Sequence, residues 1–241
     1  MDGFTQIVCP GCALLCDDVK VKVEGGKIVS TLHACVRGEW ALRNANNEFR
    51  LTSPFVKKNG KLVKVSFDEA LDRAAEIFLN AERPLLWGWS SASVEAQRIG
   101  VFLAKRLGAV IDSTSSICHG SSILAGREAG FRTATLGEVK NRADLLVYWG
   151  SDPSHSHPRQ MGYEQKKLMI IDVRKSRTGK VANQVLEIEP NKDYELISAM
   201  RMILKGKNFK EKEVAGIPVK TLNQIIETWK TQQFGVIFVG L

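Results

Sequence analysis

The sequence of 241 residues lacks any apolar run approaching the roughly 20 residues that a membrane helix needs. Its first residues show no basic segment followed by an apolar stretch, so an export signal is not indicated. It contains neither an internal repeat nor a low-complexity tract. With 44% hydrophobic and 25% charged residues, it is an ordinary globular chain, not a disordered, collagen-like or coiled-coil one. We therefore expect a soluble, cytoplasmic protein with no membrane span.

The charge is unbalanced, because 34 Lys and Arg residues face 26 Asp and Glu residues, a formal net charge of +8. Such an excess suits nucleic acid, an acidic membrane or a polyanionic cofactor. The basic runs at 57–64 and 205–212 are short and have few aromatic residues between the charges. We therefore expect no nucleic-acid partner.

The pattern of apolar residues predicts two kinds of structure along the chain. Residues 19–23 and 27–31 alternate apolar and polar positions around Glu-Gly-Gly, which indicates a β-hairpin. After a polar stretch that ends near residue 55, short apolar strands alternate with amphipathic helices, as in a doubly wound, mostly parallel α/β sheet. We expect three parts: a small β module at 1–55, a partial α/β domain at 56–128 and an α/β domain at 129–241.

The individual α/β elements follow from the same pattern. Ser66 and Glu69 form a capping-box motif before one helix, and Asn191 is placed to cap another. The remaining expected helices lie at 94–107 and 221–231. The expected strands are 84–87, 109–111, 144–149, 167–172, 185–188 and 235–239.

The five cysteines are few, odd in number and unevenly placed, so a disulfide framework is not expected. Cys9, Cys12 and Cys16 have the spacing Cys-x2-Cys-x3-Cys, and Cys35 completes a set of four. Three thiolates on one tight loop can hold three corners of a cubane, and a distant fourth closes it. We predict a [4Fe-4S] cluster, with a structural zinc as the alternative, although zinc usually takes two separated cysteine pairs.

The fifth cysteine, Cys118, follows an expected strand, precedes an expected helix and is followed by His119. A helix N-terminus stabilises a thiolate, which is then a good metal ligand or nucleophile. The adjacent imidazole can move a proton near neutral pH. The alternative is an inert core cysteine.

Two strand ends carry candidate nucleotide contacts. Gly150, Ser151, Asp152 and Pro153 form a turn after the 144–149 strand, where backbone N–H and hydroxyl groups can meet a diphosphate. The next strand ends at Asp172, which suits a ribose or guanine, with Arg174 two residues on, which suits phosphate. No Gly-x-Gly-x-x-Gly motif is present, so a standard nicotinamide site is not supported. The alternative is two solvated loops.

Two histidines and three tryptophans are assigned structural positions and not functional roles. His155 and His157 invite a metal assignment, but a polar surface loop is the better prediction. Trp87, Trp89 and Trp149 stand at strand ends and are expected in the core or in a pocket wall.

In this order, the four-cysteine loop, the later Cys-His pair and the strand followed by Gly-Ser-Asp-Pro resemble the molybdopterin and tungstopterin oxidoreductases. Within them, Cys-Pro-Gly-Cys-Ala-Leu-Leu-Cys-Asp-Asp and Ser-Ile-Cys-His-Gly resemble the metal-site subunits of formylmethanofuran dehydrogenases. The resemblance covers essentially the whole chain, as the amino-terminal part of such a subunit. It implies reversible reduction of carbon dioxide to formate at a molybdenum or tungsten bis(pterin guanine dinucleotide), with electrons passing through the [4Fe-4S] cluster.

The resemblance also implies roles for the candidate residues. Cys118 would be the protein ligand of the molybdenum or tungsten, and His119 would lie at the reaction site. Arg37 occupies the place of a lysine that the family usually carries between cluster and pterin; it keeps the charge but changes the donor geometry. The turn at residues 150–153 and Asp172 would hold one guanine dinucleotide arm. The family's active-site arginine has no matching motif here, and we expect it beyond residue 241.

The implied partners are an amidohydrolase subunit, a second pterin-binding subunit and ferredoxin-like subunits of one complex. Two alternatives remain open. One is a formate dehydrogenase with the same Cys-His chemistry, and the other is a non-catalytic iron-sulfur electron-transfer or scaffold subunit.

Overall fold

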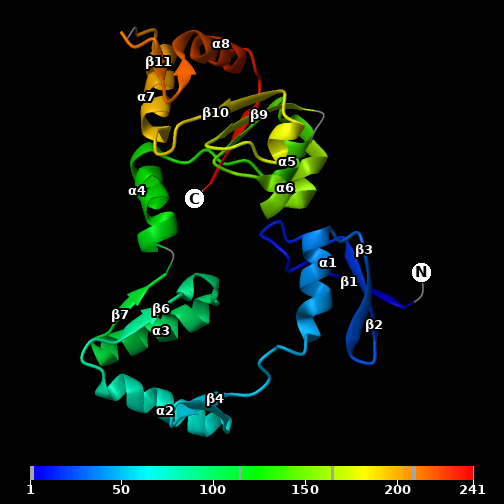
Figure 1. Ribbon diagram of the computed structural model, residues 1–241, viewed down its shortest axis with the longest axis vertical. Helices are drawn as coiled ribbons and strands as arrows, with labels where there is room; N and C mark the ends of the chain where they lie inside the picture. Colours follow the sequence, from blue (N-terminus) through cyan, green and yellow to red (C-terminus); the bar gives the residue numbers. More distant parts are fainter. Residues whose placement is uncertain (1–2, 114, 164–165, 208–209, 241) are drawn as a thin grey trace. The chain divides into compact units, whose positions relative to one another are not determined.

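The computed structural model describes residues 3–113, 115–163, 166–207 and 210–240 (Figure 1). The chain forms two compact units, because most contacts between residues fall within one unit or the other. The first unit comprises Met1–Asn47 and Thr133–Leu241, and the second comprises Glu48–Arg132. None of the described helices combines the length and apolar character needed to cross a membrane.

The amino-terminal part of the first unit is a small antiparallel sheet with the strand order β1-β2-β3. β2 and β3 form the predicted hairpin, with a register shift between Lys22 and Val23. Helix α1 follows the sheet, and buried Leu42 from this helix packs with Cys9, Val19 and Val21. The bounds are β1 Phe4–Ile7, β2 Val19–Glu24, β3 Lys27–Leu32, α1 Val36–Arg43 and the short turn η1 Asn44–Asn46.

A four-stranded parallel sheet with the order β10-β9-β8-β13 is the centre of the carboxyl-terminal part of the first unit. It confirms the prediction of a mixed α/β fold with a parallel sheet. The bounds are β8 Leu145–Trp149, β9 Lys167–Asp172, β10 Gln184–Glu187 and β13 Gly235–Val239. All four strands run in the same direction, so their carboxyl ends share one edge.

Helices cover both faces of this sheet, which explains why every residue of β8 is buried (Figure 1). One face, with Val147 and Ile171, packs on α7 Asp193–Leu204 and α8 Val219–Lys230. The other face, with Leu146 and Ile170, packs on α5 Leu136–Arg142, which a Thr135–Glu138 capping box begins. The remaining elements are α6 Pro153–Ser156, η4 Pro158–Tyr163, η5 Thr178–Lys180, β11 Glu213–Val214 and β12 Ile217–Pro218.

The second unit contains two short parallel strands, β6 and β7, and a β-hairpin of β4 and β5. The Ser66 hydroxyl accepts from the backbone N–H of Glu69 at 3.1 Å, which is one half of the predicted capping box, whereas the Glu69 carboxylate pairs with Lys58. The bounds are β4 Phe55–Lys58, β5 Lys61–Lys64, α2 Phe67–Asn80, β6 Leu85–Trp87, η2 Trp89–Ser91, α3 Val94–Leu107, β7 Val110–Asp112, the π-helical turn η3 Ser115–His119 and α4 Gly120–Ala129.

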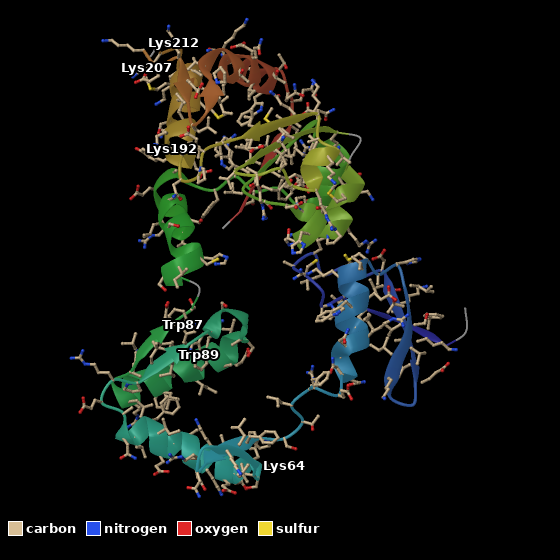
Figure 2. All side chains as sticks on the ribbon, viewed as in Figure 1. Lys64, Trp87, Trp89, Lys192, Lys207 and Lys212 are labelled. Carbon is tan, nitrogen blue, oxygen red and sulfur yellow. The ribbon has the colours of Figure 1, made fainter. Side chains whose placement is uncertain are left out.

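One local prediction is wrong. Asn191 does not cap α7, because its φ of 61° lies in the left-handed region and Lys192 occupies the capping position instead. The basic run at 57–64 is exposed, as expected of a solvated charge run, and it lies in the β4–β5 hairpin that ends at Lys64 (Figure 2). At the other run, Lys207 and Lys212 are exposed, as expected.

Candidate metal and cofactor site

The four predicted cluster cysteines line one small cavity in the first unit. We call this cavity the cysteine pocket, defined by Cys9, Cys12, Cys16 and Cys35. All four thiols are free of disulfides, and Cys9 is buried. Cys35 stands at the N-cap of α1.

Backbone hydrogen bonds fold the cysteine loop tightly. The N–H of Cys9 donates to the carbonyl of Cys16 at 2.8 Å, and the N–H of Leu15 donates to the carbonyl of Cys12 at 3.3 Å. Leu15 has a φ of 46°, a left-handed conformation that turns the chain back toward Cys16. In addition, the N–H of Gly11 lies 3.4 Å from the Cys9 sulfur, so it can donate to a thiolate there.

Gly11 and Gly38 allow the cysteine loop to approach α1 closely. Neither glycine was predicted as a site residue. A Cβ on Gly38 would lie 2.8 Å from the Cys9 sulfur and 3.9 Å from the Cys35 sulfur. A Cβ on Gly11 would lie 2.8 Å from the Cα of Gly38. The space beside the sulfurs therefore exists because both positions lack a side chain.

The donor set suits a [4Fe-4S] cluster in its chemistry, because four thiols line one cavity. In a cubane each thiolate binds a different iron, so the sulfurs surround the cluster and do not converge on one point. Among the residues that the structure describes, no three His, Cys, Asp or Glu side chains are arranged to hold one metal ion.

A charged pair that the sequence did not suggest borders the cysteine pocket. Arg159, from η4, lines the cavity and pairs through both terminal nitrogens with the carboxylate of Asp18, one contact measuring 2.7 Å. Hydrogen bonding from Arg159 lowers the pKa of Asp18 to about 2. The hydrogen bonds to Asp18 raise the pKa of Arg159 in turn. The two residues are 141 positions apart, so no local motif could have indicated the pair.

The structure places Arg37 against the cysteine loop. Its Nε donates to the carbonyl of Gly11 at 2.7 Å. Burial, followed by the charge of Arg37, lowers the pKa of His157, which is half-buried. His155 is exposed, as expected of a surface position, but it lies in the short helix α6 and not in a loop, and the half-buried His157 follows this helix.

The turn after β8 lies at the carboxyl edge of the parallel sheet, as predicted. Gly150 has a φ of 60°, and its N–H donates to the carbonyl of Ile171 at 2.8 Å. Gly240, after the neighbouring strand β13, approaches so closely that an added Cβ would lie 2.0 Å from the carbonyl oxygen of Gly150. Ser151 is half-buried and Pro153 is buried at the first position of α6.

Asp152 acts within this turn as a hydrogen-bond acceptor for the protein itself. Its Oδ1 accepts from the Ser154 hydroxyl at 2.7 Å, from the Thr178 hydroxyl and from the Thr178 backbone N–H at 3.4 Å. Burial opposes ionisation of Asp152, but the bonds from Ser154 and Thr178 outweigh it and hold the pKa below its usual range. Thr178, fully buried, is thus a structural partner that sequence reasoning missed.

The end of β9 combines a buried acid with exposed cations. Asp172 is buried, and its Oδ1 accepts from the backbone N–H of Arg174 at 3.3 Å. The loop that follows carries exposed basic side chains at Arg174 and Lys175. Such a loop at the carboxyl edge of a parallel sheet is suited to bind phosphate groups.

Cys118 belongs to the second unit, in the π-helical turn η3 that runs directly into α4. Cys118 is half-buried and His119 is exposed. A Cβ on Gly120 would lie 1.9 Å from the carbonyl oxygen of Ser115, so this turn requires glycine where the helix begins. π-helical turns occur often at functional sites.

The tryptophans agree only in part with their predicted positions. Trp149 is buried, and its Nε1 donates to the carboxylate of Asp193 at 2.6 Å. Trp89 lies over Gly100 of α3, where an added Cβ would come within 2.5 Å of the ring. Trp87, by contrast, is 60% exposed, so it forms no part of a buried core (Figure 2).

Comparison with known proteins places the chain in a family. Residues 50–233 match molybdopterin oxidoreductase, and the chain therefore belongs to the molybdopterin oxidoreductase family.

Within that family, the chain is similar to two curated proteins, each described as the B subunit of a tungsten-containing formylmethanofuran dehydrogenase 2. The protein from Methanococcus maripaludis is 39% identical over 257 residues, which cover 100% of this chain and 59% of that protein. The protein from Methanocaldococcus jannaschii is 41% identical over 252 residues, which cover 98% of this chain and 58% of that protein. The chain thus spans less than two thirds of the length of these relatives.

More distant relatives share the fold. F420-dependent formate dehydrogenase 1 subunit alpha from Methanococcus maripaludis is 24% identical over 251 residues, which cover 95% of this chain and 37% of that protein. The solved structure of acetylene hydratase from Pelobacter acetylenicus superimposes with a TM-score of 0.73 at 18% identity, over 96% of this chain and 39% of that chain. At that identity the superposition shows the fold alone.

Proposed function

We propose that this chain is part of the metal-site subunit of a formylmethanofuran dehydrogenase, which reversibly reduces carbon dioxide to formate before a partner subunit transfers formate to methanofuran. The observation that carries the proposal is the cysteine pocket, in which four thiols line one cavity in a member of the molybdopterin oxidoreductase family. The names of the two formylmethanofuran dehydrogenase relatives support the choice of substrate.

In this proposal, Cys9, Cys12, Cys16 and Cys35 hold a [4Fe-4S] cluster, and Cys118 ligates molybdenum or tungsten of a bis(pterin guanine dinucleotide). When bound, the metal and its pterins supply two-electron chemistry, and the cluster supplies one-electron exchange. Two pterin guanine dinucleotides bring four phosphates, and the net charge of +8 would help to neutralise them.

The chain's own residues would bind and orient the cofactor, and His119 would move protons. The turn at Gly150, Ser151, Asp152 and Pro153 would present backbone N–H groups to one dinucleotide. Asp172 would accept from its guanine or ribose, and the exposed Arg174 would meet phosphate. Because the Asp152 carboxylate is already engaged with Ser154 and Thr178, its role is to hold the turn in shape.

Two further residues complete the assignment. His119, exposed beside Cys118, would move a proton at the reaction site. Arg37 would supply positive charge between cluster and pterin, since its guanidinium is already anchored on the cysteine loop by the Gly11 carbonyl.

Metal analysis and electron paramagnetic resonance of the anaerobically purified complex test the proposal. We expect iron and sulfide in a ratio that fits a [4Fe-4S] cluster, together with tungsten or molybdenum. Zinc without iron, tungsten or molybdenum would contradict the proposal.

A formate dehydrogenase is the second candidate, because the alpha subunit of an F420-dependent formate dehydrogenase matches 95% of the chain. The two activities are separated by substrate. Turnover that requires methanofuran supports the first candidate, whereas full turnover with free formate and an artificial dye alone supports the second.

A non-catalytic iron-sulfur or scaffold subunit is the remaining alternative, and Cys118→Ser distinguishes it. If Cys118 is the metal ligand, this variant loses tungsten or molybdenum and activity while it keeps its iron. Unchanged activity and metal content would rule out the catalytic assignment.

A further inference from the structure

Arg159 is the one cationic side chain that lines the cysteine pocket among the described residues. Cys16 lines the same pocket, so the guanidinium and the Cys16 sulfur border one cavity. A guanidinium has five N–H donors in a fixed plane, so it can serve a sulfur and a carboxylate at the same time.

Asp18 fixes the orientation of this guanidinium. The carboxylate accepts from both terminal nitrogens of Arg159, the bidentate geometry that restricts an arginine most. The side chain of Asp18 is 47% exposed and that of Arg159 is 36% exposed. An ion pair so accessible to water adds little to folding stability. Replacing Arg159 should therefore leave the fold intact.

The backbone that carries Arg159 is itself ordered by neighbouring contacts. The N–H of Gln160 donates to the carbonyl of His157 at 2.8 Å, and the N–H of His157 donates to the carbonyl of Pro153 at 2.8 Å. These bonds connect η4 through α6 to the turn after β8. The guanidinium therefore reaches the cysteine pocket from the edge of the parallel sheet and not from the cysteine loop.

We propose that Arg159 raises the reduction potential of the cluster by placing its positive charge in the cysteine pocket, with Asp18 holding the guanidinium in place. This inference rests on the proposed cluster at the four cysteines.

The direction of the effect follows from charge. Reduction adds one negative charge to the cluster, and a nearby guanidinium stabilises that charge more than it stabilises the oxidised form. Hydrogen bonds to the sulfurs and the local net charge are among the factors that set the potential of an iron-sulfur cluster. Loss of Arg159 should therefore make the cluster harder to reduce.

The test is a potentiometric titration of the anaerobically purified full chain, followed by electron paramagnetic resonance of the reduced cluster. Arg159→Gln removes the charge, and Arg159→Lys retains it without the planar fork. At the midpoint of the unmodified chain, we expect the ratio of oxidised to reduced cluster to rise several-fold in Arg159→Gln, where a tenfold rise corresponds to about 59 mV for one electron. Arg159→Lys should shift the ratio less.

Arg142→Gln is the matched control, because it makes the same substitution in the same unit at an exposed arginine that pairs with Glu138 and does not line the pocket. A shift in Arg159→Gln no larger than in Arg142→Gln, with the iron content unchanged, would overturn the inference. If Arg159→Gln loses iron, the test is made with Arg159→Lys instead. A reduction potential in Arg159→Lys equal to that of Arg142→Gln would then overturn the inference. Loss of iron from both variants would show that Arg159 holds the loop and does not tune the potential, which also overturns it.

Iron and sulfide are measured first in the unmodified chain. Their absence would refute the proposed cluster, whereas their presence with no shift in Arg159→Gln would refute only the role of Arg159. The orienting role of Asp18 is tested separately. The effect of Arg159→Gln should be smaller in an Asp18→Asn background than in the unmodified chain, and equal effects would show that Asp18 does not orient the arginine.

Discussion

At the scale of single residues, the cysteine pocket depends on small side chains as much as on thiols. Gly11 and Gly38 let the cysteine loop and the first turn of α1 come into backbone contact, and both glycines line the pocket beside the sulfurs of Cys9 and Cys35. Any side chain at Gly38 would compete with the Cys9 sulfur for this space. A cysteine spacing identifies the donors, but the glycines decide whether a cluster has room beside them.

Gly38→Ala tests this dependence. The added methyl would lie 2.8 Å from the Cys9 sulfur, closer than atoms in proteins pack, so the sulfur must move. We expect the iron and sulfide bound per chain to fall by more than half, measured chemically after anaerobic purification. Gly137→Ala in α5 is the matched control, since its Cβ would have no atom closer than 3.9 Å. Full iron content in Gly38→Ala would show that the pocket tolerates the methyl group.

Asp152 connects two segments at the edge of the sheet. One of its carboxylate oxygens accepts hydrogen bonds from Ser154, which follows the β8 turn, and from Thr178 in a separate loop. Asp152→Asn would place an amide where three donors converge. We expect it to destabilise the metal-free chain by about 1–3 kcal/mol at neutral pH, because buried donors lose their charged acceptor. Urea denaturation measures the loss.

The unmodified chain and the Asp152→Asn variant should also differ in their response to pH. The pKa of Asp152 is lower in the folded chain than its ordinary value, so its contribution is complete above about pH 3.9 and declines as the pH falls through the lower folded value. The stability difference between the two proteins should therefore be constant from pH 7 to pH 5 and shrink below pH 4. A difference that grows on acidification would contradict the assigned role.

At the scale of elements, the regular parts of the chain could be predicted from the sequence and the irregular parts could not. The limits of α3, β9 and β13 match the apolar pattern residue for residue, since period and buried strand length are local properties. The π-helical turn around Cys118 carries no such signal. Its form depends on how closely Gly120 approaches Ser115, a distance that only the folded backbone defines.

The residues of the candidate site likewise fall into those that the sequence predicted and those that it did not. The cysteine spacing predicted which thiols share a pocket, because four donors on two short segments are nearly local. Arg159 and Thr178 were missed because they reach Asp18 and Asp152 from distant positions in the sequence. Likewise, Asp152 was expected to face a nucleotide, and its engagement with Ser154 and Thr178 depends on contacts that only the fold creates.

Gly120→Ala tests the turn that carries Cys118. The added methyl would overlap the carbonyl oxygen of Ser115, so the turn must change and Cys118 must move with it. We expect tungsten or molybdenum content and activity to fall at least tenfold while the iron content stays the same. Glu128→Ala, an exposed change in the same helix, is the control and should alter neither. If iron falls together with tungsten, the variant has disturbed the whole chain and not this turn alone.

At the scale of the whole molecule, the two units differ in how they are stabilised. The parallel sheet of the first unit has apolar clusters on both faces. In the described part of the second unit, the buried hydrophobic side chains are Leu86 and Ala104, and no apolar cluster of buried residues forms. Many of its large apolar side chains are exposed, among them Leu79, Trp87, Val94, Ile99, Phe102, Ile117 and Phe131.

This contrast predicts how the parts behave when they are separated. Burial of apolar surface is the main favourable term in folding, about 25 cal/mol for each Å² removed from water, and it must exceed the conformational entropy that the chain loses. A fragment of residues 133–241 buries both faces of its sheet, so we expect it to unfold cooperatively in urea. A fragment of residues 48–132 should show no cooperative transition and should bind a hydrophobic dye, because its helices have no core on which to pack. Cooperative unfolding of the 48–132 fragment as a monomer would mean that its exposed apolar residues rearrange into a core of their own. Circular dichroism and sedimentation, applied to both fragments under the same conditions, distinguish these outcomes.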